Sequence, residues 1–213
     1  MCGRYMLYYE KDVIIDAFNL VNEFDYEERF NIAPSQEVLA VVKGSNGNRA
    51  GYMKWGLVPK WSPDLKIGNK LINARSETID QKPSFKESFY QKRCLIPASG
   101  FYEWVQSDRG KKQPYSFKLE DKKPFAFAGI WSRWTGEVNG KTVERITCSI
   151  LTKASTPKMQ RYHHRMPVML KPQEGEKWLN RSVEKDALLS ILDRNNPDLD
   201  VEQVSFDLNL NTK

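Results

Sequence analysis

Short runs of β-type residues alternate with turn residues along most of the chain. The runs are rich in β-branched and aromatic residues and are bounded by Gly, Pro, Asn or Asp, a pattern that predicts strands. They cover residues 37–43, 92–104, 114–120, 124–134, 144–153 and 166–170. Asn139-Gly140 lies between two of these runs and is the strongest short-range signal for a hairpin. The turn-rich residues 44–48 indicate a second hairpin.

Two other segments carry apolar residues three and four positions apart, the spacing of an amphipathic helix. They are residues 10–20 and 182–196, and residues 76–92 predict a shorter helical segment interrupted at Pro83. The chain has no internal repeat and no linker-like tract. We therefore expect one α+β domain spanning residues 1–213, with a mainly antiparallel, partly barrel-like β core flanked by helices.

Composition supports a packed, water-soluble protein. Of 213 residues, 40% are hydrophobic and six are tryptophan, which is enough apolar side chain for a core. No apolar run reaches the roughly 18 residues of a membrane helix, and the first 25 residues lack the order of a signal peptide. We expect a cytoplasmic protein with no membrane contact. The net charge of +6 favours a polyanionic partner without requiring one.

Three cysteines, Cys2, Cys94 and Cys148, lie far apart and never in a C-x-x-C pair. Neither a disulfide scaffold nor a zinc site is indicated, and no residue pattern calls for a metal or an organic cofactor. Cys94 and Cys148 lie in strand-like apolar surroundings, where a free cysteine usually acts as a small buried hydrophobe. Cys2 has no such surroundings.

Cys2 directly follows the initiator methionine, and aminopeptidases generally remove methionine before a small residue. Cleavage leaves an α-amine and a thiol on one residue, a pair that captures an aldehyde as a thiazolidine ring. Their reference pKa values, about 7.7–8.0 for the amine and about 8.5 for the thiol, leave both partly nucleophilic near neutral pH. We expect Arg4 to lower both pKa values further. The alternative is an ordinary cysteine at a frayed or uncleaved terminus.

The segment INARSET (72–78) gathers polar side chains after apolar residues. The amide of Asn73 is suited to holding a backbone or carbonyl group, and the planar fork of Arg75 is suited to a phosphate. Asn, Ser and Thr also form loops and helix caps, so the segment has a purely structural interpretation as well.

The segment ASGFYEWV (98–105) reads as a strand, in which alternation puts Phe101 and Glu103 on one face and Tyr102 and Trp104 on the other. A carboxylate among aromatic rings is a candidate for a raised pKa and for general acid–base catalysis, because desolvation disfavours its charged form. The alternative is a glutamate on the wet face of a half-buried sheet.

The chain's two histidines, His163 and His164, are adjacent in YHHRMPVML (162–170). An extended backbone would point them to opposite sides, so they are not expected to chelate a metal together. We expect one to be catalytic and Arg165 to meet a phosphate. A surface histidine pair is the alternative.

The segment MKWGLVPKWSPD (53–64) interleaves lysines with Trp55 and Trp61. Aromatic rings stack on unpaired bases while lysines follow the phosphates, so this pattern favours single-stranded nucleic acid. Core tryptophans are the alternative, especially for Trp55.

Six segments, in order over nearly the whole chain, resemble the SOS-response-associated peptidase family of abasic-site processing proteins. They are MCGRY (1–5), FNIAPSQ (30–36), WGLVPKW (55–61), NARSET (73–78), RCLIPASGFYEW (93–104) and HHRMPVML (163–170). The resemblance implies a β-rich domain with a groove for single-stranded DNA and for single-strand/duplex junctions that contain abasic sites. It also implies a monomer that associates with the nucleoid when bound to DNA.

The resemblance assigns roles by position. Cys2 becomes the nucleophile that crosslinks to the abasic site, and Asn73 supports the terminal residue. Glu103 and His163 assist opening of the sugar ring and proton transfer. The family's peptidase name reflects self-cleavage after Met1.

The resemblance likewise implies phosphate contacts by Arg4, Arg75 and Arg165 and a base or sugar contact by Trp61. His164 stands where many relatives have an acidic or amide residue. The resemblance further implies a thiazolidine as the crosslink, and an imine that sulfur has not captured would permit weak strand cleavage by β-elimination.

Two functions of other classes compete with this interpretation. Glutamine-dependent amidotransferases also use a mature N-terminal cysteine, but they need an ammonia-accepting domain that 213 residues leave no room for. A single-strand-binding protein without catalysis would explain the lysines and tryptophans, and its complexes would dissociate in denaturant or high salt.

Overall fold

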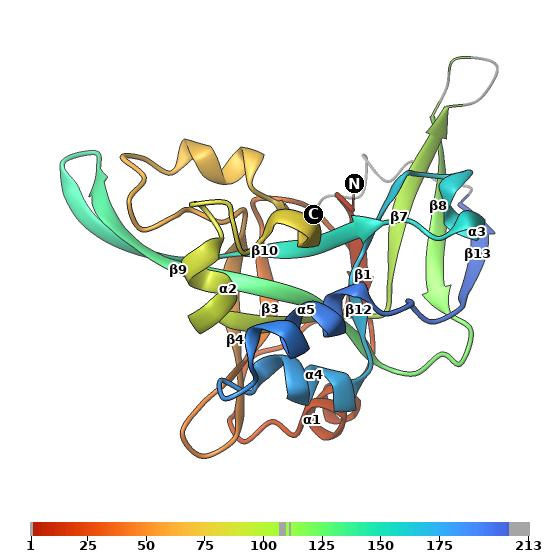
Figure 1. Ribbon diagram of the computed structural model, residues 1–213, viewed down its shortest axis with the longest axis horizontal. Coiled ribbons are helices and arrows are strands. Elements are labelled where there is room, and N and C mark those ends of the chain that lie inside the picture. The colour runs from red at the N-terminus through yellow and green to blue at the C-terminus, as the bar shows by residue number, and fades with distance from the viewer. Residues whose placement is uncertain (1, 107–109, 111, 205–213) are drawn as a thin grey trace.

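The computed structural model describes residues 2–106, 110 and 112–204 (Figure 1). Its centre is a ring of five strands, β3 (Glu37–Lys43), β4 (Asn48–Trp55), β6 (Arg93–Ala98), β9 (Phe125–Val138) and β10 (Lys141–Ala154). They pair in the order β10-β4-β3-β6-β9, and β9 pairs again with β10. The β4–β10 pair is parallel and the others are antiparallel. The predicted β core is confirmed, and its barrel is closed.

A second, antiparallel sheet lies beside the ring. Its strands, in spatial order, are β13 (Leu199–Gln203), β8 (Lys112–Leu119), β7 (Gly100–Gln106), β1 (Tyr5–Leu7) and β2 (Arg29–Ile32). Figure 1 shows β7 and β8 on the opposite side of the molecule from the long β9–β10 hairpin. The N-terminal strand therefore belongs to the second sheet.

The run at 92–104 is two strands in different sheets, divided beside the glycine that the sequence marks as a turn. The chain leaves the ring at Ser99, whose N–H donates to Met6 O at 2.8 Å and whose hydroxyl accepts from Tyr8 N–H at 3.0 Å. Gly100 follows because a Cβ there would lie 2.7 Å from Phe117 O. This break carries β7, and with it Glu103, out of the ring and alongside β1.

Short strands and helices complete the fold. β5 (Asn73–Arg75) and β11 (Arg165–Pro167) pair with β10, and β12 (Met169–Leu170) pairs with β9. The helices are α1 (Lys11–Phe18), α2 (Lys86–Gln91), α3 (Pro157–Gln160), α4 (Pro172–Leu179) and α5 (Lys185–Asp193), with 3₁₀ turns η1 (Lys66–Lys70) and η2 (Ser76–Thr78). Figure 1 shows α1, α4 and α5 grouped at one side of the ring.

The predicted helices are confirmed: residues 10–20 form α1, 182–196 contain α5, and 76–92 contain η2 and α2. Helix α4 had not been predicted. It begins with Pro172 in its first turn, and Glu174 accepts a hydrogen bond from Lys171 N–H at 2.6 Å. Both are recognisable start features, but the helix that contains them is only eight residues long.

Helix α4 packs against β6 and β9 of the ring through Trp178. The indole is fully buried and its Nε1–H donates to Cys94 O at 3.0 Å and Gly129 O at 3.2 Å, carbonyls of β6 and β9. Arg93 in turn donates from Nε to Trp178 O at 2.7 Å. Trp55 is also buried, so its core interpretation is confirmed, as is the burial of Cys94 and Cys148.

Both predicted hairpins are present. Asn139 and Gly140 have φ angles of 52° and 71°, the left-handed pair that a two-residue hairpin needs. Residues 44–47 join β3 to β4, with Lys43 paired to Asn48. Within the described ranges, no helix is long and apolar enough to cross a membrane.

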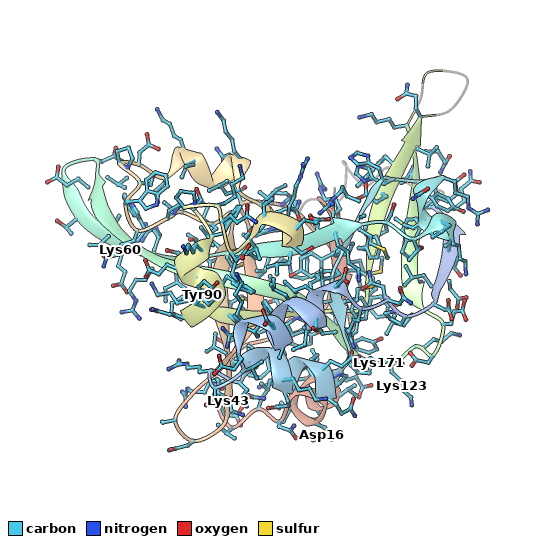
Figure 2. All side chains as sticks on the ribbon, viewed as in Figure 1. Asp16, Lys43, Lys60, Tyr90, Lys123 and Lys171 are labelled. Atoms are coloured by element: carbon cyan, nitrogen blue, oxygen red, sulfur yellow. The ribbon has the colours of Figure 1, made fainter. Side chains whose placement is uncertain are left out.

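The basic residues are spread over the surface. Figure 2 shows Lys43 and Lys171 near α4, and Lys60 at another side, below the β9–β10 hairpin. Lys43 pairs with Glu176 at 3.2 Å and Lys171 with Asp121 at 3.3 Å. The net charge therefore does not by itself locate a binding site.

We predict that Trp178→Ala lowers the free energy of unfolding by about 3–5 kcal/mol, because it opens a cavity and leaves two buried carbonyls without their donor. Trp61→Ala, at a side chain 58% exposed, should stay within about 0.5 kcal/mol. Urea denaturation measures both. Equal losses for the two variants would contradict this account of the core.

Candidate functional site

The N-terminal segment lies between β7 and β5. Tyr5 pairs with Phe101 across β1 and β7, and Tyr102 N–H donates to Arg4 O at 2.9 Å. From the other side, Asn73 Nδ2 donates to Cys2 O at 3.0 Å. The structure thus brings Cys2 and Asn73 together, and hydrogen bonds hold the N-terminal segment on both sides.

Cys2 is fully buried, so it is not part of a frayed terminus. Met1 lies outside the described residues, so its removal stays a prediction. Burial raises the pKa of the Cys2 thiol well above its usual range, and the carboxylate of Glu103 raises that pKa further. The resting thiol is therefore protonated at neutral pH.

Arg4 lowers the thiol pKa, as expected, through a backbone hydrogen bond, but desolvation outweighs this and every other lowering effect. Arg4 acts on the thiol through its carbonyl oxygen, which lies 3.9 Å from Cys2 Sγ and accepts its hydrogen bond. Its guanidinium donates from Nη1 to Asn31 Oδ1 at 3.0 Å.

Glu103 lies in β7 on the face that packs toward the ring, and it is 4% exposed. The predicted alternation is confirmed: Phe101 joins the main core, whereas Tyr102 joins a smaller cluster with Met6 and Val204 on the other face. The wet-face alternative is wrong because the Glu103 face is covered. Burial is the main cause that raises the pKa of the Glu103 carboxyl.

The two histidines do not point to opposite sides. They follow α3 in a turn, where His163 N–H donates to Met159 O at 3.1 Å, and their rings stack with centroids 4.4 Å apart. The prediction failed because the backbone is not extended until Arg165 begins β11. Each ring is consequently a close electrostatic neighbour of the other.

The His163 ring has a defined orientation. Its Nδ1 lies 2.9 Å from Arg165 N and 3.1 Å from Arg165 O, so the Arg165 backbone holds the ring in either tautomer. Burial lowers the pKa of His163, and the charge on His163 is the main cause that lowers the pKa of exposed His164. Burial thus favours a neutral His163 imidazole whose Nδ1 is held by the Arg165 backbone.

The predicted DNA-contact residues differ in solvent exposure. Trp61 is highly exposed, on a loop held by the hydrogen bond from Trp134 Nε1 to Ser62 O at 2.8 Å. Arg75 is exposed as well. Arg165 is buried, and its guanidinium donates to Glu77 at 2.6 and 2.9 Å, a carboxylate that sequence reasoning had not singled out.

No local pattern marks Glu77 as the partner of Arg165, because 88 residues separate them.

In the described part of the chain, no group of three or more His, Cys, Asp or Glu side chains is arranged to hold a metal ion.

A concavity of about 860 Å³ lies elsewhere, over the second sheet. Its lining includes Met6, Tyr102 and the stacked rings of Tyr8 and Phe30, but none of Cys2, Asn73, Glu103 and His163. The four predicted catalytic residues and this hollow are therefore separate features.

Comparison with known proteins gives a consistent result. The family model described as SOS response associated peptidase matches residues 1–211. The chain is 43% identical over 197 residues to the abasic site processing protein YoqW of Bacillus subtilis, covering 90% of this chain and 86% of that protein. It is 27% identical over 191 residues to the abasic site processing protein YedK of Escherichia coli, covering 86% and 81%. A crystal structure of a Bacteroides thetaiotaomicron protein aligns with a TM-score of 0.84 at 26% identity, covering 95% of this chain and 92% of that one.

We predict that both histidines titrate below the ordinary value, and that His163→Gln raises the pKa of His164 by removing the neighbouring imidazolium. His164→Gln should leave the His163 pKa low, because burial is its main cause. NMR titration of the Hε1 protons resolves this in a chain with two histidines. A His164 pKa that is the same with and without His163 would contradict the coupling.

Proposed function

This chain belongs to the SOS response associated peptidase family, and we propose that it processes abasic sites in DNA by capturing them covalently through Cys2. The names of its relatives support abasic-site processing as the general function. The observation that carries the chemistry is the burial of Cys2 between the amide of Asn73 and the carboxyl of Glu103.

An abasic deoxyribose is mostly a closed hemiacetal, and opening it to the aldehyde adds a proton to the ring oxygen and removes the proton of the C1′ hydroxyl. Glu103 is suited to supply the first proton, because burial raises its pKa and favours the protonated acid. His163 is suited to take up the second, because burial favours its neutral ring, which has one unprotonated nitrogen. Both groups move protons and form no bond to the sugar.

The crosslink forms in two steps once Met1 has been removed. The Cys2 amine condenses with the C1′ aldehyde, forming a C=N bond and releasing water. The Cys2 thiol then adds across that bond, its sulfur joining C1′ and its proton passing to nitrogen, and the thiazolidine ring closes. Because the resting thiol is protonated, Glu103, after it has given up its own proton, is the base that takes the thiol proton and passes it to the nitrogen.

The same scheme includes the side reactions. An imine that sulfur has not captured permits β-elimination, so weak strand cleavage accompanies the crosslink.

Met1 leaves by self-cleavage or by an aminopeptidase. Asn73 holds the Cys2 carbonyl and so keeps the amine of the mature terminus in place.

Exposed side chains would bind the DNA strand. Arg75 directly follows Asn73 and Ala74 in the chain, and Trp61 offers a ring for base or sugar stacking. Arg4 is a further proposed phosphate contact, whereas Arg165, predicted as one from the sequence, would reach a phosphate only by leaving its pair with Glu77. The substrate is single-stranded DNA or a single-strand/duplex junction, and the protein acts as a monomer.

We predict that the wild-type protein, with loss of Met1 verified by intact mass, forms a complex with an abasic single-stranded oligonucleotide that survives a denaturing gel. Cys2→Ala should abolish it, and Cys148→Ala, at another buried free cysteine, should not. A complex that forms only under native conditions would favour the binding-protein alternative. Glutamine hydrolysis would favour the amidotransferase.

We further predict that Glu103→Gln slows crosslinking by about 10²–10⁴-fold, the usual contribution of a positioned acid–base group. Quenched time courses on the same oligonucleotide measure the rate. Glu202→Gln is the matched control, because Glu202 lies in the same sheet with a side chain 69% exposed. Equal rates for Glu103→Gln and wild type would remove Glu103 from the mechanism.

A further inference from the structure

Arg165 and Glu77 form a bidentate ion pair beside the site. Arg165 Nη1 lies 2.6 Å from Glu77 Oε1, and Nη2 lies 2.9 Å from Oε2. The Arg165 side chain is 11% exposed and that of Glu77 is 48% exposed. The hydrogen bond from Arg165 lowers the pKa of Glu77, so the carboxylate stays charged in mildly acidic solution.

The pair bridges two segments on opposite sides of β10. On one side, β5 pairs in parallel with β10, with Arg75 opposite Thr152. On the other side, β11 pairs antiparallel, with Arg165 opposite Ala154. The Arg165 guanidinium also donates to Thr152 O at 2.7 Å, and Glu77 Oε1 accepts from Ala154 N–H at 3.2 Å. The end of β10 is therefore tied to both segments.

Each of the two segments contacts a residue of the proposed site. The β5 segment presents Asn73, whose amide holds Cys2 O. The β11 segment presents Arg165 N–H, which holds His163 Nδ1. A single side chain pair thus connects the group that positions Cys2 with the group that orients the His163 ring.

We propose that Glu77 is a positioning residue for the crosslinking reaction: by clamping Arg165 it fixes the His163 segment relative to the Asn73 segment. This inference rests on the proposed function. Glu77 contacts neither Cys2 nor His163 directly, and its effect passes through Arg165 and the end of β10.

A different role for Arg165 makes a contrasting prediction. If Arg165 binds a DNA phosphate, Glu77 competes with that phosphate for the same fork of N–H donors. Loss of Glu77 would then strengthen DNA binding and leave the chemical step unchanged. Loss of the clamp would instead slow the chemical step, because displacement of a reacting group by about 1 Å can cost about 10²-fold in rate.

The test compares Glu77→Gln, Arg165→Lys and the double variant with wild type in the full chain. Glu77→Gln removes the charge and keeps the shape, whereas Arg165→Lys keeps the charge and removes the bidentate fork. The matched control is Glu144→Gln, because Glu144 pairs with Arg133 at 3.6 Å on the β9–β10 hairpin and its side chain is 51% exposed. Thermal unfolding of each variant checks that it is folded, and Glu77→Asp, which keeps the carboxylate, replaces any variant that is not.

Two quantities are measured separately for each variant. Affinity is measured by fluorescence anisotropy with an oligonucleotide that carries a tetrahydrofuran site, which lacks the aldehyde and cannot crosslink. The maximal crosslinking rate, and its dependence on pH, are measured with saturating abasic oligonucleotide.

We expect Glu77→Gln and Arg165→Lys each to lower the maximal rate at least about tenfold, with affinity changed less than about threefold and a displaced pH profile. The double variant should be no slower than the slower single variant, because both changes break one clamp. Glu144→Gln should match wild type in every measurement.

Tighter binding of Glu77→Gln with an unchanged maximal rate would overturn the proposal in favour of phosphate competition. A maximal rate and pH profile equal to those of wild type would overturn it as well. Failure of the proposed function looks different, because wild type itself would then give no crosslink that depends on Cys2.

Discussion

Burial of the N-terminal segment is the constraint on which the rest of the site depends. Residues 2–4 are held by β7 on one side and by the Asn73 amide on the other, at the boundary between the second sheet and the ring. Cys2 and Glu103 therefore share one dry environment. Desolvation disfavours the charged form of each, so it raises the pKa of the Cys2 thiol and that of the Glu103 carboxyl. An exposed terminus with the same residues would have a partly ionised thiol and an ionised carboxylate.

The break at Ser99 makes this arrangement possible. The strand run 93–106 contributes β6 to the ring and β7 to the second sheet, so a continuous chain links the barrel to the strand that carries Glu103. Because β7 pairs with β1, the same break determines which residues flank Cys2. The two sheets are thus not independent layers. A distortion at Ser99 or Gly100 would displace β7, and with it Glu103 and the strand next to Cys2.

Much of this structure could be predicted from the sequence, but not the parts that depend on distant partners. The strand of residues 37–43, the Asn139-Gly140 hairpin and both amphipathic helices have strong local patterns, and all are present. Strand β13 was missed because its alternating pattern is short and includes Asp and Glu, which are uncommon in strands but suit a sheet edge. The histidine stack depends on the turn that follows α3, and the Glu77–Arg165 pair depends on how distant segments meet, and the local spacing encodes neither. The depth of Cys2 burial is likewise a property of the assembled sheets.

Burial of a nucleophile is compatible with the proposed reaction because the amine and the thiol act in sequence. The amine acts first, on an aldehyde that Glu103 helps to release, and the thiol is needed only after the imine has formed beside it. A protonated thiol in a dry site is a poor nucleophile and a poor target for oxidants, since both reactions require the thiolate. In the proposed reaction, proton transfer from Glu103 to the sugar leaves a carboxylate next to the thiol when a base is required. Sugar opening then precedes sulfur capture, because it supplies both the aldehyde and the base.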